Sequence, residues 1–182
     1  MEGLLAHTIP QHAFDLHAKR LLLMLKAITR TTLRTTWSWR SYAIYMNPAA
    51  EIEVGLTGAS EIVVGTRDTA PHVGSGKIKV LATPVMVSLM EEAALNTVEN
   101  HLPPGFQTVG TRLDITHVAA TPVGLHVVAR AEVIQVEGRR ITFRVWADDE
   151  KDRIGEGMHE RIVVDVARFD ARAQQKAPRR AP

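Results

Sequence analysis

The chain has 182 residues, 45% of them hydrophobic, and a formal net charge of +2 at pH 7. This is enough for one domain with a core and short extensions. It has no cysteine, which excludes a disulfide framework, a zinc ribbon and a thiol nucleophile. No apolar run approaches the roughly 20 residues that a membrane-spanning helix needs, so we expect a cytoplasmic protein without membrane contact.

Residues 1–45 differ from the rest of the chain. They contain six Lys and Arg against two acidic residues and are rich in Thr, Ser and Trp. One interpretation is an organellar targeting peptide, which has this composition. We favour a poorly ordered extension, with Met46 as the functional start. The remaining chain carries a slight excess of acids, so its charge does not indicate nucleic-acid binding.

A β-rich domain with one long helix is predicted for residues 46–168. Three short strands are expected first, at 52–56, 61–66 and 74–82. The helix follows over 83–102, with Thr83 at its N-cap and Pro84 at its first position. LPPG at 102–105 ends it.

Four longer strands are predicted after the helix. Two of them, GLHVVARAEVIQV and RITFRVWA, alternate apolar and polar residues as half-buried antiparallel strands do. The expected bounds are 106–117, 123–136, 140–149 and 153–167. Residues 169–182 form a polar, basic tail that we expect to be irregular. The pattern predicts an α+β fold in which the sheet covers the apolar stripe of the helix.

Glu91 is the most informative residue of the predicted helix. The polar face is formed by Ser88, Glu92, Asn96 and Glu99, and the apolar stripe by Val87, Met90, Ala94, Leu95 and Val98. Glu92 belongs to the polar face, whereas Glu91 falls within the apolar stripe. A carboxylate in that position must be paired, be protonated or take part in chemistry.

Three residues are candidates for a common site: Thr83, Glu91 and His117. A hydroxyl, a carboxylate and an imidazole are the groups that acid–base or nucleophilic hydrolysis requires. Each also has a structural interpretation. Thr83 is a good helix cap, Glu91 is a potential arginine partner, and a single histidine on a strand is more often structural. His126 and His159 also lie on predicted strands and are the alternatives to His117.

Three segments resemble a known family: ATPVMVSLMEEAALNTVE, TVGTRLDITHVAATPVGL and VEGRRITFRVWADDEKDRIGEGMHERIVVDVARF. They closely resemble the fluoroacetyl-CoA thioesterase-like group of the hotdog-fold thioesterases, over roughly residues 75–177. The specific motifs are TH-x-AATP-x-G, VEGRR and IG-x-G-x-HER. The resemblance implies a curved antiparallel sheet around one long helix, a homodimer or larger homo-oligomer, and hydrolysis of small acyl-CoA thioesters without metal or bound cofactor.

The resemblance also implies roles for individual residues. Thr83, Glu91 and His117 match the catalytic Thr, Glu and His of the family. Gly110 matches a glycine whose backbone N–H helps to hold the thioester oxygen, and Arg161 matches an arginine near the acyl-CoA pocket. Whether Glu91 is a general base or a nucleophile, and whether Thr83 is a nucleophile or a hydrogen-bond donor, stays open at this point.

One departure limits the resemblance. The fluoroacetyl-CoA enzymes carry a phenylalanine-rich lid before the helix, whereas this chain has SGKIKVLA, without an aromatic residue. We therefore expect hydrolysis of a small or medium acyl-CoA, with the acyl group undefined. The alternatives are an acyl-CoA-binding module without turnover and, with less support, an enoyl-CoA hydratase.

Two charged clusters have simpler interpretations. Arg139 and Arg140 follow a glycine at a hairpin turn and are expected to be solvated, with contacts to CoA phosphates as the alternative. The acids at 148–152 crowd the next turn. Their spacing matches no metal-binding loop, so we expect a solvated turn.

Overall fold

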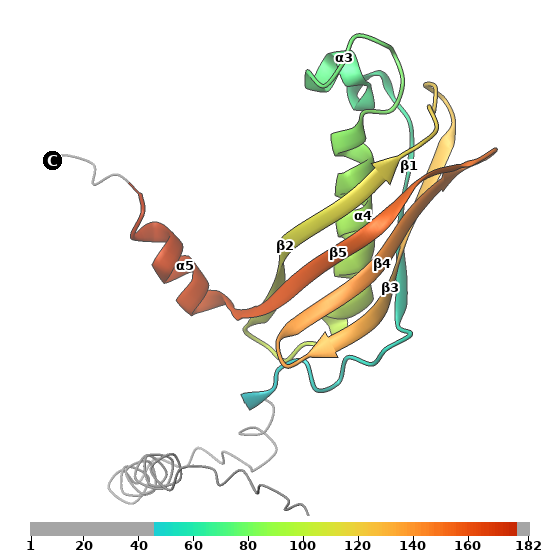
Figure 1. Cartoon of the computed structure of the whole chain (residues 1–182). Coiled ribbons are helices and arrows are strands. Elements are labelled where there is room, and N and C mark those ends of the chain that lie inside the picture. Colours follow the sequence, from blue (N-terminus) through green and yellow to red (C-terminus); the bar gives the residue numbers. More distant parts are fainter. Residues whose placement is uncertain (1–45, 178–182) are drawn as a thin grey trace, which may run out of the picture. The chain divides into compact units, whose positions relative to one another are not determined.

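The computed structural model describes residues 46–177, so the predictions on residues 1–45 and on the last residues of the tail lie outside it. Five strands and one long helix form the body of the domain (Figure 1). The elements in chain order are β1 (Thr57–Val63), the 3-10 turn η1 (Thr66–Asp68), α3 (Ala70–Val73), α4 (Thr83–Val98), the 3-10 turn η2 (Glu99–His101), β2 (Phe106–His117), β3 (His126–Glu137), β4 (Arg140–Asp149), β5 (Arg153–Asp165) and α5 (Val166–Gln174).

The strands form one antiparallel sheet in the order β1-β3-β4-β5-β2, which curves around α4 (Figure 1). This confirms the predicted α+β class. Side chains alternate between the two faces of a strand, and every second residue of the central strands β3 and β4 is fully buried. These residues form the inner face of the sheet. These inward residues are Val127, Ala129, Ala131 and Val133 of β3, and Ile141, Phe143, Val145 and Ala147 of β4.

Small residues bring α4 close to the sheet. A Cβ atom built on Gly58 of β1 would lie 2.9 Å from the carbonyl oxygen of Ala93 and 2.5 Å from the hydroxyl of Thr97. Only glycine fits that contact, so Gly58 sets the depth at which the helix packs. The fully buried face of α4 contains Met86, Met90, Ala93, Ala94 and Val98.

Four details of the prediction are wrong. The two early strands are a single strand, β1, because the chain turns at Gly55 with φ +94°. Residues 74–82 form only isolated bridges at Val80 and Leu81, whose partners lie outside the named strands. The N-cap of α4 is Ala82, and Thr83 is its first helical residue.

The fourth error is the tail, which continues as the helix α5. Asp165 caps this helix, because its carboxylate accepts a hydrogen bond of 3.0 Å from the backbone N–H of Arg168. The sequence prediction treated this segment only by its polarity and overlooked the cap. None of the helices in the described part of the chain has the length and apolar character needed to cross a bilayer.

Candidate active site

Thr83 and His117 form a hydrogen-bonded pair at one end of the domain. Thr83 is the first residue of α4 and His117 is the last residue of β2. The Thr83 hydroxyl oxygen lies 2.8 Å from Nδ1 of His117. The predicted proximity of these two residues is therefore found in the structure. The Thr83 side chain contacts the histidine and does not cap the helix.

The second ring nitrogen of His117 has no hydrogen bond within the described part of the chain, although the backbone of Ala119 lies close enough to the ring to influence its pKa. Nε2 is buried and makes no hydrogen bond to any described residue. Burial lowers the pKa of His117 below its ordinary value, so the imidazole is neutral at pH 7. A buried, unpaired ring nitrogen costs stability and is characteristic of a site that a ligand or a partner completes.

Thr121 holds the loop that follows His117. It is fully buried, and its hydroxyl donates a hydrogen bond of 2.8 Å to Oδ2 of Asp149. Its carbonyl oxygen accepts a bond of 2.8 Å from the backbone N–H of Leu81, two residues before Thr83. One residue thus joins the chain segments that carry both members of the Thr83–His117 pair.

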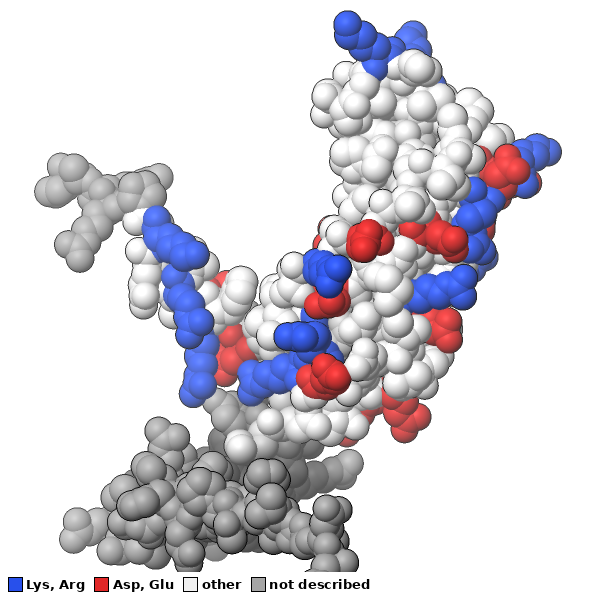
Figure 2. All heavy atoms as spheres, viewed as in Figure 1, with Lys and Arg blue, Asp and Glu red and all other residues white. Residues whose placement is uncertain are grey.

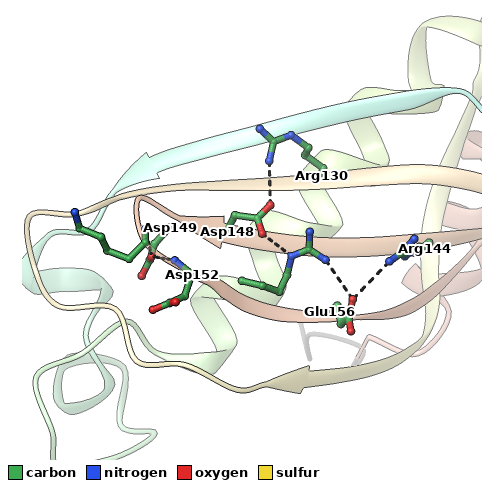
Figure 3. A network of polar contacts seen from close by, with 8 residues as sticks. Arg130, Arg144, Asp148, Asp149, Asp152 and Glu156 are labelled. Carbon is green, nitrogen blue, oxygen red and sulfur yellow. Dashed lines mark hydrogen bonds and ion pairs between the residues drawn. The ribbon is translucent and has the colours of Figure 1, made fainter.

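Asp149 also organises the β4–β5 hairpin. Its Oδ1 accepts the backbone N–H groups of Lys151 and Asp152, and Figure 3 shows Asp149 and Asp152 at this turn. Desolvation raises the pKa of Asp149, but the hydrogen bonds from Asp152, Lys151 and Thr121 outweigh it and lower the pKa overall. The carboxylate is therefore ionised and acts as a fixed acceptor for Thr121.

We expect Thr121→Val to weaken both stability and turnover. The change removes a buried hydroxyl that donates to a carboxylate, which should lower the free energy of unfolding by about 1–3 kcal/mol. The kcat for the expected thioester hydrolysis should also fall, because the Thr83 hydroxyl and the His117 ring are no longer held at hydrogen-bonding distance. Urea unfolding and kcat measure the two effects. Thr116→Val is the matched control, because its exposed hydroxyl bonds only a backbone oxygen of Glu156. Equal losses in both variants would contradict a special role for Thr121.

Of the other acids in the 148–152 turn, Asp148 takes part in a surface ion-pair network. Asp148 pairs with Arg130 and Arg153, and Arg153 and Arg144 both reach Glu156 (Figure 3). Within residues 46–177, no group of three or more His, Asp or Glu side chains is arranged to hold a metal ion. Exposed pairs of this kind contribute little stability individually.

Glu91 lies at the edge of the buried face of α4, and its side chain is 39% exposed. Its expected position inside a fully apolar stripe is therefore wrong in detail. Val87 and Leu95, one turn on either side, are likewise half-buried, because the face against the sheet is centred on Met86, Ala93 and neighbouring residues. Glu92 is exposed and accepts a hydrogen bond of 2.6 Å from Ser60. The two adjacent glutamates thus occupy different environments, as predicted.

A buried polar network lies behind Glu91. His159 is completely buried, and its Nδ1 lies 2.9 Å from the carbonyl oxygen of Arg112, to which it must donate. Nε2 of His159 then accepts a bond of 3.2 Å from the Arg161 guanidinium. Burial lowers the pKa of His159, so the ring is neutral. The 3.9 Å approach of Nε2 to the Glu91 carboxylate therefore joins two acceptors and is not a salt bridge.

Arg161 is the cation of this network. Its guanidinium donates to the Thr108 hydroxyl at 2.8 Å and to the Thr108 carbonyl oxygen at 3.1 Å. The Thr108 hydroxyl in turn donates to Glu99 at 2.8 Å. Burial lowers the pKa of Arg161, and the charges of Glu91 and Glu99 oppose that shift. Arg161 is thus a fixed positive charge placed between two carboxylates.

Gly110 provides the space that Glu91 occupies. A Cβ atom at residue 110 would lie 2.8 Å from Oε1 of Glu91 and 3.1 Å from Cε1 of His159. The β2–β5 register also shifts between Gly110 and Arg112, which marks a β-bulge at this point. Bulges are frequent next to active sites, where they redirect backbone groups. The predicted site residue Gly110 therefore lies directly beside Glu91.

We expect Gly110→Ala to reduce kcat by about 10- to 100-fold, because the new methyl group displaces the Glu91 carboxylate from its position. Far-UV circular dichroism should show a folded protein. Gly65→Ala is a matched control, since its Cβ would meet only a side-chain oxygen of Asp68, at 3.3 Å. Wild-type kcat in Gly110→Ala would contradict this role.

The predicted triad does not converge within one chain. Glu91 lies eight residues after Thr83, which corresponds to about 12 Å along the helix axis. Glu91 lies against Gly110 and His159 and interacts electrostatically with Arg161, and within the described residues no hydrogen bond joins it to the Thr83–His117 pair. The structure therefore contains two half-sites, one with the hydroxyl and imidazole and one with the carboxylate.

Sequence reasoning missed His159, Thr108 and Thr121 as site residues. His159 was only an alternative to His117. A signal was present, because His159 and Arg161 occupy alternate, inward positions of β5, where apolar residues are expected. Thr121 gave no comparable signal, since its partners come from distant parts of the chain.

The architecture and the site define the chain as a hotdog-fold protein of the thioesterase type. Similar solved structures include the fluoroacetyl-CoA thioesterase FlK, with a TM-score of 0.67 and 40% identity, covering 70% of this chain and 98% of that one. A Thermus thermophilus thioesterase superfamily member has a TM-score of 0.65 and 29% identity, covering 69% and 93%.

The sequence comparisons give the family. The model of the fluoroacetyl-CoA-specific thioesterase family matches residues 64–167. A fluoroacetyl-CoA thioesterase from Streptantibioticus cattleyicolor is 47% identical over 100 residues, which are 55% of this chain and 72% of that protein. The chain belongs to this thioesterase family, as the sequence motifs indicated.

Proposed function

We propose that the protein hydrolyses a small or medium acyl-CoA to the free acid and CoA. Its family membership and the contact between Thr83 and His117 at 2.8 Å, with an unpaired Nε2 beside it, support this proposal. The reaction adds one water across the thioester C–S bond. It needs a nucleophile, donors for the developing oxyanion and a proton for the leaving thiolate. We also propose a cytoplasmic location.

The residues divide this chemistry between them. Glu91 activates the attacking water or attacks the carbonyl itself. The backbone N–H of Gly110 binds the thioester oxygen, and the positive charge of Arg161 attracts and orients the Glu91 carboxylate. Thr83 and the neutral His117 hold the thioester end of the substrate by hydrogen bonds, and a proton of the attacking water ends on the CoA sulfur. No metal or bound cofactor is needed for these steps.

We propose a homodimer as the active form, because the two half-sites lie apart within one chain. β2 is an edge strand of 12 residues, and residues 110–114 are all exposed. Long free edges are ordinarily paired or protected. Antiparallel pairing of β2 with β2 of a second copy places the Gly110 half of one strand beside the His117 half of the other. Light scattering coupled to gel filtration tests the stoichiometry, and a monomer with full activity would contradict the proposal.

An acyl-CoA panel with a thiol reagent tests the reaction itself. We expect release of free CoA from short- and medium-chain substrates. Binding of acyl-CoA without thiol release would instead support a binding module, and loss of enoyl absorbance without thiol release would support a hydratase.

Fluoroacetyl selectivity is not part of the proposal. The segment before α4 is exposed from Pro71 to Lys79 and contains no aromatic residue. Ile78, its largest apolar side chain, is 75% exposed. We therefore expect comparable kcat/KM values for acetyl-CoA and fluoroacetyl-CoA. A preference of more than about 100-fold for the fluorinated substrate would contradict this expectation, since it requires almost 3 kcal/mol of discrimination.

A further inference from the structure

A basic hollow lies between α5 and the end of β5, away from the half-sites described above. It has a volume of about 410 Å³. Figure 2 shows a row of Lys and Arg side chains along α5, with further basic side chains across the gap. The charged residues of the basic hollow are Arg139, Asp165, Arg168, Arg172 and Lys176, and its apolar wall includes Ile162, Val164 and Phe169.

The charge of the basic hollow is strongly positive. Four cationic side chains line it against one carboxylate, that of Asp165. The Asp165 carboxylate already has partners, because it caps α5 and lies 3.8 Å from Nε of Arg168. Arg172 lies in the last turn of α5 and Lys176 follows two residues after its end, and both are exposed at the hollow. Like charges in this arrangement repel each other unless an anion lies between them.

The apolar wall of the hollow indicates that a bound anion would also carry an apolar or aromatic group. Phe169 is 45% exposed although it is aromatic, and it projects from α5 into the hollow. Arg139 lies on the opposite side, where its guanidinium already stacks on the Phe106 ring at 5.6 Å from the centroid. An exposed aromatic side chain beside several cations suits a ligand with a planar base and phosphate groups.

We propose that the basic hollow binds the 3′-phosphorylated adenosine diphosphate end of the acyl-CoA substrate. This inference rests on the proposed function. In the proposed dimer, the Phe106 end of β2 lies beside the His117 end of the partner strand, so the hollow of one copy opens near the Thr83–His117 pair of the other. The phosphates bind Arg172 and Lys176, with Arg139 and Arg168 adding to the positive field, and the adenine packs against Phe169.

The test compares two substrates in the full-length protein. An acyl-CoA carries the nucleotide, whereas the same acyl group on pantetheine lacks it. For the double variant Arg172→Glu/Lys176→Glu we expect KM for the acyl-CoA to rise about tenfold or more, which corresponds to the loss of one or two charge-assisted contacts. The kcat/KM for the pantetheine thioester should stay within about twofold of the wild type.

Lys151→Glu is the matched control, because Lys151 is exposed on the hairpin at the opposite end of β5. It should leave both KM values near those of the wild type. An unchanged KM for acyl-CoA in the double variant would overturn the proposal. So would equal losses on both substrates, since these would indicate that α5 serves the fold or the dimer interface.

A direct titration separates this inference from the proposed function. Adenosine 3′,5′-bisphosphate should bind the wild type by calorimetry, and the double variant at least tenfold more weakly. If no thioester is hydrolysed by the wild type, the proposed function fails, and this titration still decides the fate of the basic hollow. Absence of nucleotide binding to the wild type would overturn the hollow as a nucleotide site.

Discussion

Glu91→Gln lowers kcat for acyl-CoA hydrolysis by about a thousandfold or more, whereas Glu92→Gln leaves it within about twofold. The amide is nearly the same size as the carboxylate but can neither take a proton from water nor attack a thioester, and general-base catalysis alone accounts for 10²–10⁴-fold. Glu92 points to the other side of the helix, where it accepts a hydrogen bond from the Ser60 hydroxyl.

Steady-state kinetics with one short-chain acyl-CoA measures both variants, and thermal unfolding confirms that each is folded. The two substitutions make the same chemical change one residue apart, so they differ only in the direction of the side chain. Equal effects would show that the assignment of Glu91 to the site is wrong. Detection of a covalent acyl adduct on Glu91 in the wild type would distinguish a nucleophile from a general base.

The pH dependence of kcat/KM should show an acid limb with its inflection below 6.5, the ordinary pKa of histidine. Burial disfavours the imidazolium of His117 and lowers its pKa, so the neutral ring that binds Thr83 persists to lower pH. Activity should therefore be constant above this inflection and fall as the pH drops through it. The profile of kcat/KM reports the free enzyme, in which this environment exists.

His117→Gln should remove that inflection and lower kcat/KM by about 10²–10³-fold, because the amide does not titrate and does not reproduce the hydrogen bonds that the neutral imidazole makes to Thr83 and the thioester. Thr83→Ser keeps a hydroxyl beside the ring and should retain the inflection. An inflection above 6.5 in the wild type would mean that the imidazolium is stabilised and would contradict the neutral pair.

Strands with strict alternation were predicted correctly, because burial of one sheet face imposes a period of two on the sequence. This holds for β4 and most of β3 and β5, whereas β2 was predicted at its observed bounds although residues 110–114, all exposed, do not alternate. Segments whose structure depends on distant partners were not predicted correctly. The helix boundary at Thr83 illustrates the limit: threonine followed by proline is typical of an N-cap, yet the hydroxyl is drawn to His117, 34 residues later.

The sequence by itself determined the α+β class, the family and the difference between Glu91 and Glu92, because local periodicity and specific motifs encode them. Only the tertiary structure decided that Thr83 and His117 touch while Glu91 lies apart, against Gly110 and the His159–Arg161 network. It also decided that α5 places a basic surface beside the end of β5. The physical reason is that these arrangements depend on register and helix depth, which are set by packing between residues far apart in the chain.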